Sequence, residues 1–198
     1  VVSVFIWIAN SVALLNKTGC EVTISHSIGA GNLKGAGHYA SHNITMSLVM
    51  AILMTLGYAL FAEPMVDLYS LEESVRADAL HYMYLSLVGF PQIFTTAALS
   101  GLYNAIGHSK TPFRIMCIGL ACNMLLDPLF IHLLDWGVRG AAGATVISQT
   151  VVLFLFIQKA HRDKLFNNFP FFVRLQRHYV LRILKVGVPV VLLNILFA

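Results

Sequence analysis

Five long apolar runs dominate this sequence and limit what it can fold into. They cover Val1–Ile28, Asn43–Ala62, Ala79–Ile106, Phe113–Leu134 and Val138–Gln158. An apolar run of about 18–20 residues can cross the hydrocarbon core of a bilayer as a helix. Of the 198 residues, 58% are hydrophobic and only 11% are charged, which excludes an ordinary soluble globular chain. We therefore predict a polytopic membrane protein.

The fold class predicted from these runs is all-α, a transmembrane helix bundle. Lipid offers no hydrogen-bond partners to the backbone, so spanning segments must be helices or closed barrels. Barrel strands are about half as long as these runs and alternate in polarity, which these runs do not. A sixth run, Val186–Ala198, is still apolar where the sequence stops, and no Met opens the chain. We expect an internal piece of a longer protein.

The charges between the runs predict how the chain crosses the membrane. Lys and Arg concentrate in short cytoplasmic connections. The connection Ala62–Asp78 holds five acidic residues and one Arg, whereas Lys159–Lys185 holds seven Lys and Arg and one Asp. The first, third and fifth connections are therefore predicted to be cytoplasmic, and the second and fourth external. This distribution by membrane side also argues against nucleic acid as a partner.

We expect three segments along the chain. Residues 1–158 form the transmembrane bundle with five spans, and residues 159–185 form a cytoplasmic connection. That connection is basic and aromatic at helical spacing, which predicts an amphipathic helix on the inner membrane surface. Residues 186–198 begin a further helix.

Lys17, Glu21 and Asp127 are the charged residues that lie well inside the predicted spans. A charge at the bilayer centre costs about 2.5–3.5 kcal/mol on insertion scales, so each needs a physical reason. Lys17 and Glu21 are one helical turn apart, on a polar stripe that also contains Asn10. Two interpretations stay open for this stripe. It is either a structural ion pair or the lining of a transport cavity.

No cation on its own predicted helix can pair with Asp127, but Asn123 lies one turn before it on the same face. Pro128 has no N–H to donate to the carbonyl of Met124, so it should kink the helix beside the acid. Carboxylate, carboxamide and carbonyl oxygens are hard ligands that suit Na⁺ or a proton. The pattern predicts a cation site at Asp127, and no other metal site.

Thr145 should lie at the same depth as Asp127 on the next helix. Asp127 is about 21 Å from the inner end of its span at 1.5 Å per residue, which leaves about 9 Å to the outer boundary. Thr145 is about 10 Å from the outer end of the returning helix by the same rise. A threonine in a membrane helix usually bonds the carbonyl of residue i−4, which is the competing interpretation.

No nucleophile and base are paired in the sequence, so we do not expect an enzyme, and we expect no cofactor. The spacing of His38 and His42 could suit a metal, but no Glu or Cys lies nearby. Cys20, Cys117 and Cys122 lie in apolar runs, as small buried residues do.

The chain resembles the multidrug and toxic compound extrusion (MATE) family of efflux transporters. The resemblance rests on an ordered series of motifs: IGAGNLKGAG, Tyr82 followed by Gly89 and Pro91, SGLYNAIGHSKTPFRI, NMLLDPLFI and WGVRGAAGATVISQ. It implies two six-helix lobes that work by alternating access. This chain would supply helices two to six of the N-terminal lobe and the start of helix seven.

The resemblance also implies a function and a site. The expected function is antiport, in which Na⁺ or H⁺ entry drives export of amphiphilic or cationic compounds across the cell membrane by a monomeric transporter. The family's cation site falls on Asn123, Asp127 and Thr145, with Tyr82 as a further member and an aspartate on a first helix that this chain lacks. The alternatives are a lipid-linked saccharide flippase of the same superfamily, which a strongly basic cavity would favour, and a non-transporting membrane scaffold.

Overall fold

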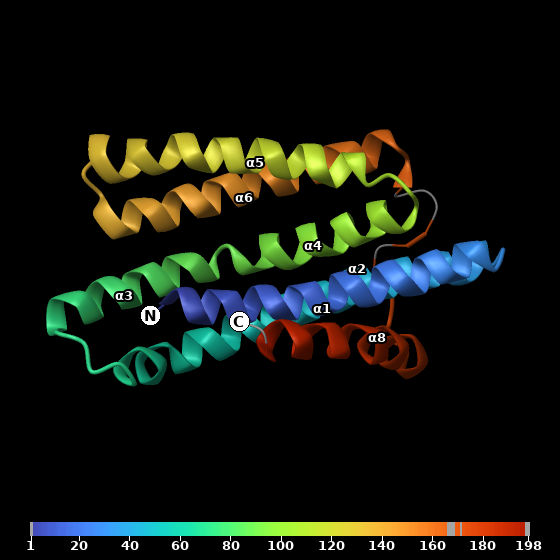
Figure 1. The fold of residues 1–198 in the computed structure, drawn as a ribbon, viewed down its shortest axis with the longest axis horizontal. Helices are drawn as coiled ribbons and strands as arrows, with labels where there is room; N and C mark the ends of the chain where they lie inside the picture. The colour runs from blue at the N-terminus through green and yellow to red at the C-terminus, as the bar shows by residue number, and fades with distance from the viewer. Residues whose placement is uncertain (1, 166–168, 171, 197–198) are drawn as a thin grey trace.

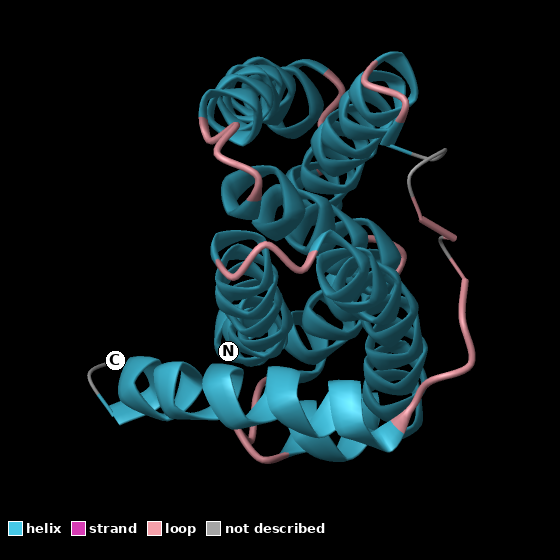
Figure 2. Ribbon diagram, turned by 90° about the vertical axis from the view of Figure 1, so that its right-hand side faces the viewer, coloured by secondary structure: helices cyan, strands magenta, loops and turns pink. Residues whose placement is uncertain are grey.

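The computed structural model describes residues 2–165, 169–170 and 172–196, and these contain helices but no strand (Figures 1 and 2). The elements are α1 (Val2–Gly29), α2 (Leu33–Asp67), α3 (Glu73–Leu87), α4 (Phe90–Ala105), α5 (Lys110–Pro128), a π-helical turn η1 (Leu129–Leu133), α6 (Gly137–Arg162) and α8 (Arg177–Leu196).

Helix α1 lies in the middle of the bundle and packs against α2, α4 and α8. Helices α5 and α6 form an antiparallel pair, which joins the rest mainly through contacts of α6 with α3 and α4 (Figure 1). The chain therefore folds as a central group around α1 with the α5–α6 pair on one side.

Three described helices are long and apolar enough to cross a membrane: Leu33–Asp67, Lys110–Leu133 and Gly137–Arg162. The pair α3 and α4 would form a fourth span if its 44° bend is counted within one crossing. Helix α1, the first predicted span, does not meet the same criterion. Its polar stripe lowers its hydropathy, and such a stripe is tolerated because other helices, rather than lipid, cover much of α1.

The predicted span Ala79–Ile106 is two helices that bend at Val88 and Gly89. Pro91 opens α4 and has no N–H to donate to the carbonyl of Leu87, so the helical ladder is interrupted there. The N–H of Val88 bonds the carbonyl of Leu85 at 3.2 Å, and that of Gly89 bonds Ser86 at 2.9 Å, which tightens the last turn of α3.

No break in the described helix coincides with the expected segment boundary at residue 186. Helix α8 begins at Arg177 and continues without a break to Leu196. Nothing between Arg177 and Val186 interrupts a helix, because the first Gly and Pro come later, at Gly187 and Pro189. Likewise α6 continues past Gln158 to Arg162.

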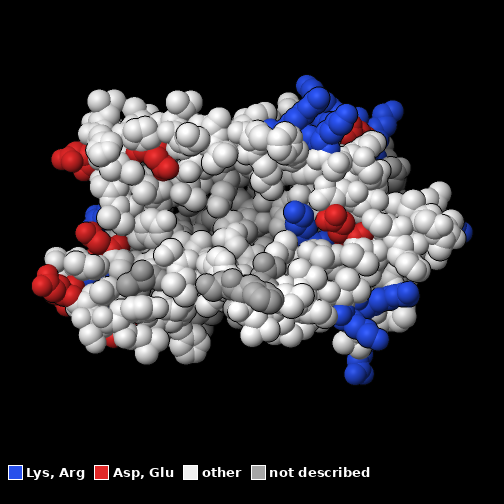
Figure 3. Space-filling model, viewed as in Figure 1, with Lys and Arg blue, Asp and Glu red and all other residues white. Residues whose placement is uncertain are grey.

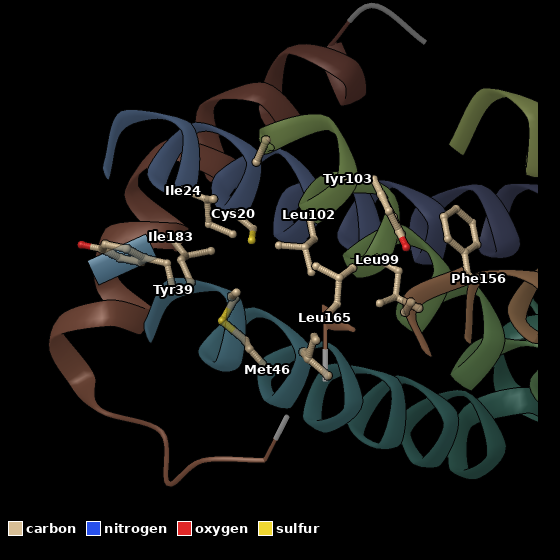
Figure 4. Packing of buried hydrophobic residues seen from close by; sticks show 14 of the residues in the cluster. Cys20, Ile24, Tyr39, Met46, Leu99, Leu102, Tyr103, Phe156, Leu165 and Ile183 are labelled. Carbon is tan, nitrogen blue, oxygen red and sulfur yellow. The ribbon is translucent and has the colours of Figure 1, made fainter. Parts of the chain in front are cut away.

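Glycines allow α8 to lie directly against α1. A methyl group on Gly187 would overlap the carbonyl oxygen of Leu15, and one on Gly19 would overlap the carbonyl oxygen of Ile183. Membrane helices approach this closely where small residues meet. Around this contact, Ile24, Tyr39, Leu102 and Ile183 share a buried cluster that draws on α1, α2, α4 and α8 (Figure 4).

A buried polar network joins α1, α2 and α4. The carboxamide nitrogen of Asn16 donates to Asn43 Oδ1 at 2.7 Å and to Ser47 Oγ at 2.5 Å. Asn43 Nδ2 donates in turn to the carbonyl of Ala98 at 3.1 Å. Buried polar groups need partners, so these bonds fix how the three helices face one another.

Lys and Arg gather at one end of the molecule, and most Asp and Glu at the other (Figure 3). The acidic end includes the connection between α2 and α3, where Arg76 Nε pairs with Asp67 Oδ1 at 2.6 Å. This is the separation that the charge pattern of the connections predicted.

Candidate functional site

Asp127 and Asn123 lie side by side on α5, and both side chains are half-buried. Asn123 Nδ2 donates to Asp127 Oδ1 at 3.4 Å. The contact follows from the helix itself, because residues four apart meet on one face. Asn123 uses its nitrogen here, so its carbonyl oxygen keeps its lone pairs for another partner.

The helix changes its winding directly after this pair. Helix α5 ends at Pro128, and the π-helical turn η1 follows, with a bond of 3.0 Å from the N–H of Leu134 to the carbonyl of Leu129. Pro128 cannot donate to the carbonyl of Met124, and the N–H of Leu129 bonds the carbonyl of Leu126. Asp127 therefore stands at an irregular point in the helix, where π-turns often mark functional sites.

Contacts between α5 and α6 show the register of Thr145. Gly119 lies against Val152, and Gly140 lies against the backbone of Phe130. In an antiparallel pair, these two contacts place Asp127 opposite the turn of α6 that contains Ala144 and Thr145. Thr145 Oγ1 donates to the carbonyl of Ala141 at 3.0 Å, as the competing interpretation expected. The hydroxyl oxygen retains lone pairs that can accept a proton donor or bind a cation.

Tyr82 reaches the same region from α3. Its side chain is half-buried, and the charge of Asp127 acts on its phenol. Helix α3 packs on α6, so three helices contribute to the surroundings of Asp127. The structure thus pairs Asp127 with Asn123 on α5, with Tyr82 on α3 near enough for the charge of Asp127 to act on it and Thr145 at the same level on α6.

The chemistry of this group is that of oxygen ligands. No group of three or more His, Cys, Asp or Glu that could hold a metal ion occurs in the part of the chain that the structure describes. A cation here would depend on one carboxylate together with carboxamide, hydroxyl and backbone oxygens. Hard oxygen ligands of this kind suit Na⁺ rather than soft metals. A lone carboxylate can also take up a proton.

A cavity of about 260 Å³ lies between α1, α4, α5 and α6. Asn10 and Lys17 line it, which agrees with one of the two interpretations of the polar stripe on α1. Three further polar residues, Thr96, Ser100 and Gln149, also line the cavity and were not expected from the sequence. The signal was present, since Thr96 and Ser100 are one turn apart and Gln149 interrupts an apolar run. The Oε1 atom of Gln149 is buried and has no hydrogen-bond partner.

The interpretation of Lys17 and Glu21 as an ion pair was wrong. Within the described chain, the ion pairs are Arg76 with Asp67 and Glu73, and Lys159 with Asp163. Glu21 Oε2 instead accepts a hydrogen bond of 3.2 Å from Asn104 Nδ2 on α4. Glu21 is also absent from the described residues that line the cavity, because it faces the end of α4, one turn beyond Lys17.

A second polar group joins the ends of α4 and α6 that lie on the basic side of the molecule. Asp163 accepts a hydrogen bond of 3.0 Å from the phenol of Tyr103 and pairs with Lys159 at 2.5 Å. The hydrogen bond from Lys159 is the main reason that the pKa of the Asp163 carboxyl lies below its usual value. This group holds the helices together and lies outside the candidate site.

Comparison with known proteins now decides the family. The family model described as MatE matches residues 1–129. The chain belongs to the MATE family. It is 26% identical over 150 residues to the probable multidrug resistance protein NorM of Thermotoga maritima, an alignment that covers 73% of this chain and 32% of NorM. It is 27% identical to the probable multidrug resistance protein YpnP of Bacillus subtilis, with 70% of this chain and 31% of YpnP covered.

Solved MATE structures have the same fold. The crystal structure of a MATE protein in its bent conformation superposes with a TM-score of 0.86 at 26% identity, covering 96% of this chain and 43% of the other. The chain therefore spans about a third of the curated relatives and less than half of the solved transporter. The prediction of an all-α, multi-pass membrane bundle corresponding to the N-terminal lobe of a MATE transporter is confirmed.

Proposed function

We propose that the full-length protein is a cation-coupled antiporter that exports amphiphilic or cationic compounds by alternating access, with Na⁺ or H⁺ as the coupling ion. Two relatives are named probable multidrug resistance proteins, which supports the export of drugs. One observation carries the ion coupling. The carboxylate of Asp127, bonded to Asn123, lies one residue before Pro128 and the π-turn η1.

The coupling rests on the charge of Asp127. An ionised carboxylate in a membrane is costly, and a bound Na⁺ or proton removes most of that cost. Asn123 and Thr145 supply neutral oxygens, and Tyr82 supplies a phenol that can donate to the carboxylate or accept from a protonated one. Occupancy of Asp127 thus changes the hydrogen bonds beside the irregular turn, where the helix is easiest to rearrange.

The cavity lined by Asn10, Lys17 and Gln149 is our candidate for part of the substrate pathway. At about 260 Å³ it is small for a drug-sized molecule, for which pockets of about 300–1,000 Å³ are usual. We propose that other parts of the full-length protein complete it. Gln149 is one turn after Thr145 on α6, so a movement of α6 would act on the cation site and the cavity together.

The test is ion-driven efflux by Asp127→Asn in the full-length protein. Cells or proteoliposomes are loaded with a cationic dye, and dye loss is followed under imposed Na⁺ or pH gradients. The variant should insert normally and lose most gradient-driven efflux, because a carboxamide neither binds Na⁺ as an anion nor takes up a proton. Asp135→Asn is the matched control, since Asp135 is an exposed carboxylate after η1.

Two results would count against the proposal. Undiminished efflux by Asp127→Asn would remove the residue from ion coupling. Absence of gradient-driven efflux in the unmodified protein, with only stability altered in the variant, would favour a non-transporting scaffold. Comparing the two gradients in the unmodified protein then distinguishes Na⁺ from H⁺ coupling.

A further inference from the structure

A second groove lies between α5 and α6 at their basic end, away from Asp127. It has a volume of about 200 Å³ and is lined by Thr111, Arg114, Ile115, Ile118, Leu155, Gln158, Lys159 and Arg162. Figure 3 shows Lys and Arg gathered on the same end of these helices, in the upper right of the view. None of the residues proposed for ion coupling or for the substrate cavity lines this groove.

The lining is ordered from polar to apolar along both helices. On α5 the residues at 111, 114, 115 and 118 form one face, and on α6 those at 155, 158, 159 and 162 do the same. Because the helices are antiparallel, Ile118 and Leu155 share the apolar end of the groove, which lies deeper in the membrane, while Arg114 and Arg162 lie toward the polar end, the mouth. The face is about 10 Å long at 1.5 Å per residue.

The cations at the mouth are not neutralised by the protein. Arg114 and Arg162 are exposed and take part in none of the described ion pairs, all of which involve Arg76 or Lys159. Lys159 is shared with Asp163. The first turn of α5 also has no acidic residue, so its positive helix end adds to the charge of Arg114. An anion at the mouth would satisfy all of these groups.

We propose that this groove binds an anionic phospholipid from the leaflet on the basic side of the membrane. The two guanidinium groups would hold the headgroup phosphate, which matches their planar pairs of donors. Thr111 and Gln158 would donate to the remaining oxygens, and an acyl chain would lie along Ile118 and Leu155. Arg114 is one residue inside the predicted span that begins at Phe113, and Lys159 is one residue beyond the span that ends at Gln158, so both lie at the membrane boundary, near the depth of lipid phosphates.

Charge and shape together favour a lipid over free phosphate. Free phosphate would use only the mouth, whereas a lipid also covers the apolar end, where half of the Ile118 side chain is exposed. Basic pockets between membrane helices on the cytoplasmic side are the usual sites of anionic headgroups. The basic end is the cytoplasmic one by the distribution of Lys and Arg.

Native mass spectrometry of the full-length protein in a neutral detergent tests the proposal. Dioleoyl phosphatidylglycerol is titrated, with dioleoyl phosphatidylcholine as the uncharged reference. We expect one phosphatidylglycerol to be retained in preference, and the double variant Arg114→Gln with Arg162→Gln to bind it about tenfold or more weakly. The matched control is Arg174→Gln with Arg177→Gln, which removes the same charge from exposed residues outside the groove.

A second variant, which changes no charged residue, tests the apolar end of the groove separately from the arginines. Ile118→Trp should fill the deep end, and because Ile118 is half exposed the fold should tolerate it. We expect it to weaken phosphatidylglycerol binding as well. Glycerol phosphate at the same concentration should not displace the lipid.

The proposal is wrong if both arginine pairs weaken binding equally, since binding would then follow total charge. It is also wrong if Ile118→Trp binds as the unmodified protein does, or if phosphatidylcholine binds as well as phosphatidylglycerol. If glycerol phosphate at an equal concentration displaced the lipid, the mouth would be a site for free phosphate, and the lipid proposal would be wrong.

Discussion

The phenol of Tyr103, near the end of α4, donates a hydrogen bond of 3.0 Å to Oδ2 of Asp163, the residue that follows α6. Tyr103 is fully buried, and Lys159 contacts the other oxygen of the same carboxylate. One carboxylate thus joins helices that are far apart in the sequence. It does so at the basic end of the bundle.

This carboxylate predicts a pH dependence of stability. The folded pKa of Asp163 is lowered, so the ionised form stabilises the fold above its usual pKa, near 3.9, and this contribution disappears as the pH falls through the lower folded value. Asp163→Asn should therefore melt below the unmodified protein at neutral pH, with the difference shrinking below about pH 4. Thermal midpoints in detergent from pH 7 to 3 measure it. Asp78→Asn, an exposed acid, should change little, and a constant difference for Asp163→Asn would contradict the prediction.

Thr145→Val should weaken ion coupling without unfolding the protein. Valine keeps the shape of the side chain but removes the hydroxyl oxygen opposite Asp127. We expect the Na⁺ or H⁺ concentration for half-maximal efflux to rise about tenfold, the scale of losing one such interaction. Thr150→Val is the matched control, because Thr150 makes the same type of bond, to the carbonyl of Val146 at 2.8 Å, and is exposed. Equal behaviour of the two variants would exclude Thr145 from the site.

Asn43→Ala should destabilise the bundle by about 1–3 kcal/mol. The change removes one of the acceptors of Asn16, which keeps Ser47 Oγ, and it removes the donor to the carbonyl of Ala98, so the buried network loses two of the bonds that join the helices. A thermal or chemical unfolding series in detergent measures the loss. Asn10→Ala should stay within about 0.5 kcal/mol, since Asn10 is exposed and bonds its own helix at Ile6. A similar small effect at Asn43 would show that the network adds no stability.

Gly187→Ala should also destabilise, by about 1–3 kcal/mol, because the added methyl group overlaps backbone at Leu15 that cannot move aside cheaply. Gly57→Ala provides the contrast. Nothing lies within 4 Å of a methyl group at Gly57, and alanine is the better helix former, so its unfolding midpoint should be equal or higher. If Gly187→Ala were as stable as Gly57→Ala, the close contact of α1 with α8 would not hold in solution.

The relations that the sequence predicted well are local ones. Asn123 and Asp127 meet because a helix places residues four apart on one face, whatever surrounds it. The level of Thr145 followed from the fixed rise per residue of two adjacent antiparallel helices. Tyr82, on a helix that is not adjacent in the chain, entered only through the resemblance to the MATE family. The role of all four residues in ion binding stays a prediction.

Relations between distant segments were missed or wrong. Lys17 and Glu21 have the spacing of an ion pair, but Glu21 bonds Asn104, which the fold brings from α4. Gln149 faces the bend at Gly89, and nothing in its own helix indicates that. A short-range pattern gives the contacts that a residue can make, whereas the packing of other helices decides which of them it makes.

By itself, then, the sequence determined the membrane helices, because apolar length and backbone hydrogen bonding leave a lipid-exposed segment few alternatives. It determined the separation of charge between the two ends and the pairing of Asn123 with Asp127 for equally local reasons. The tertiary structure decided the partner of Glu21, the network of Asn16 and Asn43 and the groove between α5 and α6. Each of these depends on surfaces that meet only after the helices pack.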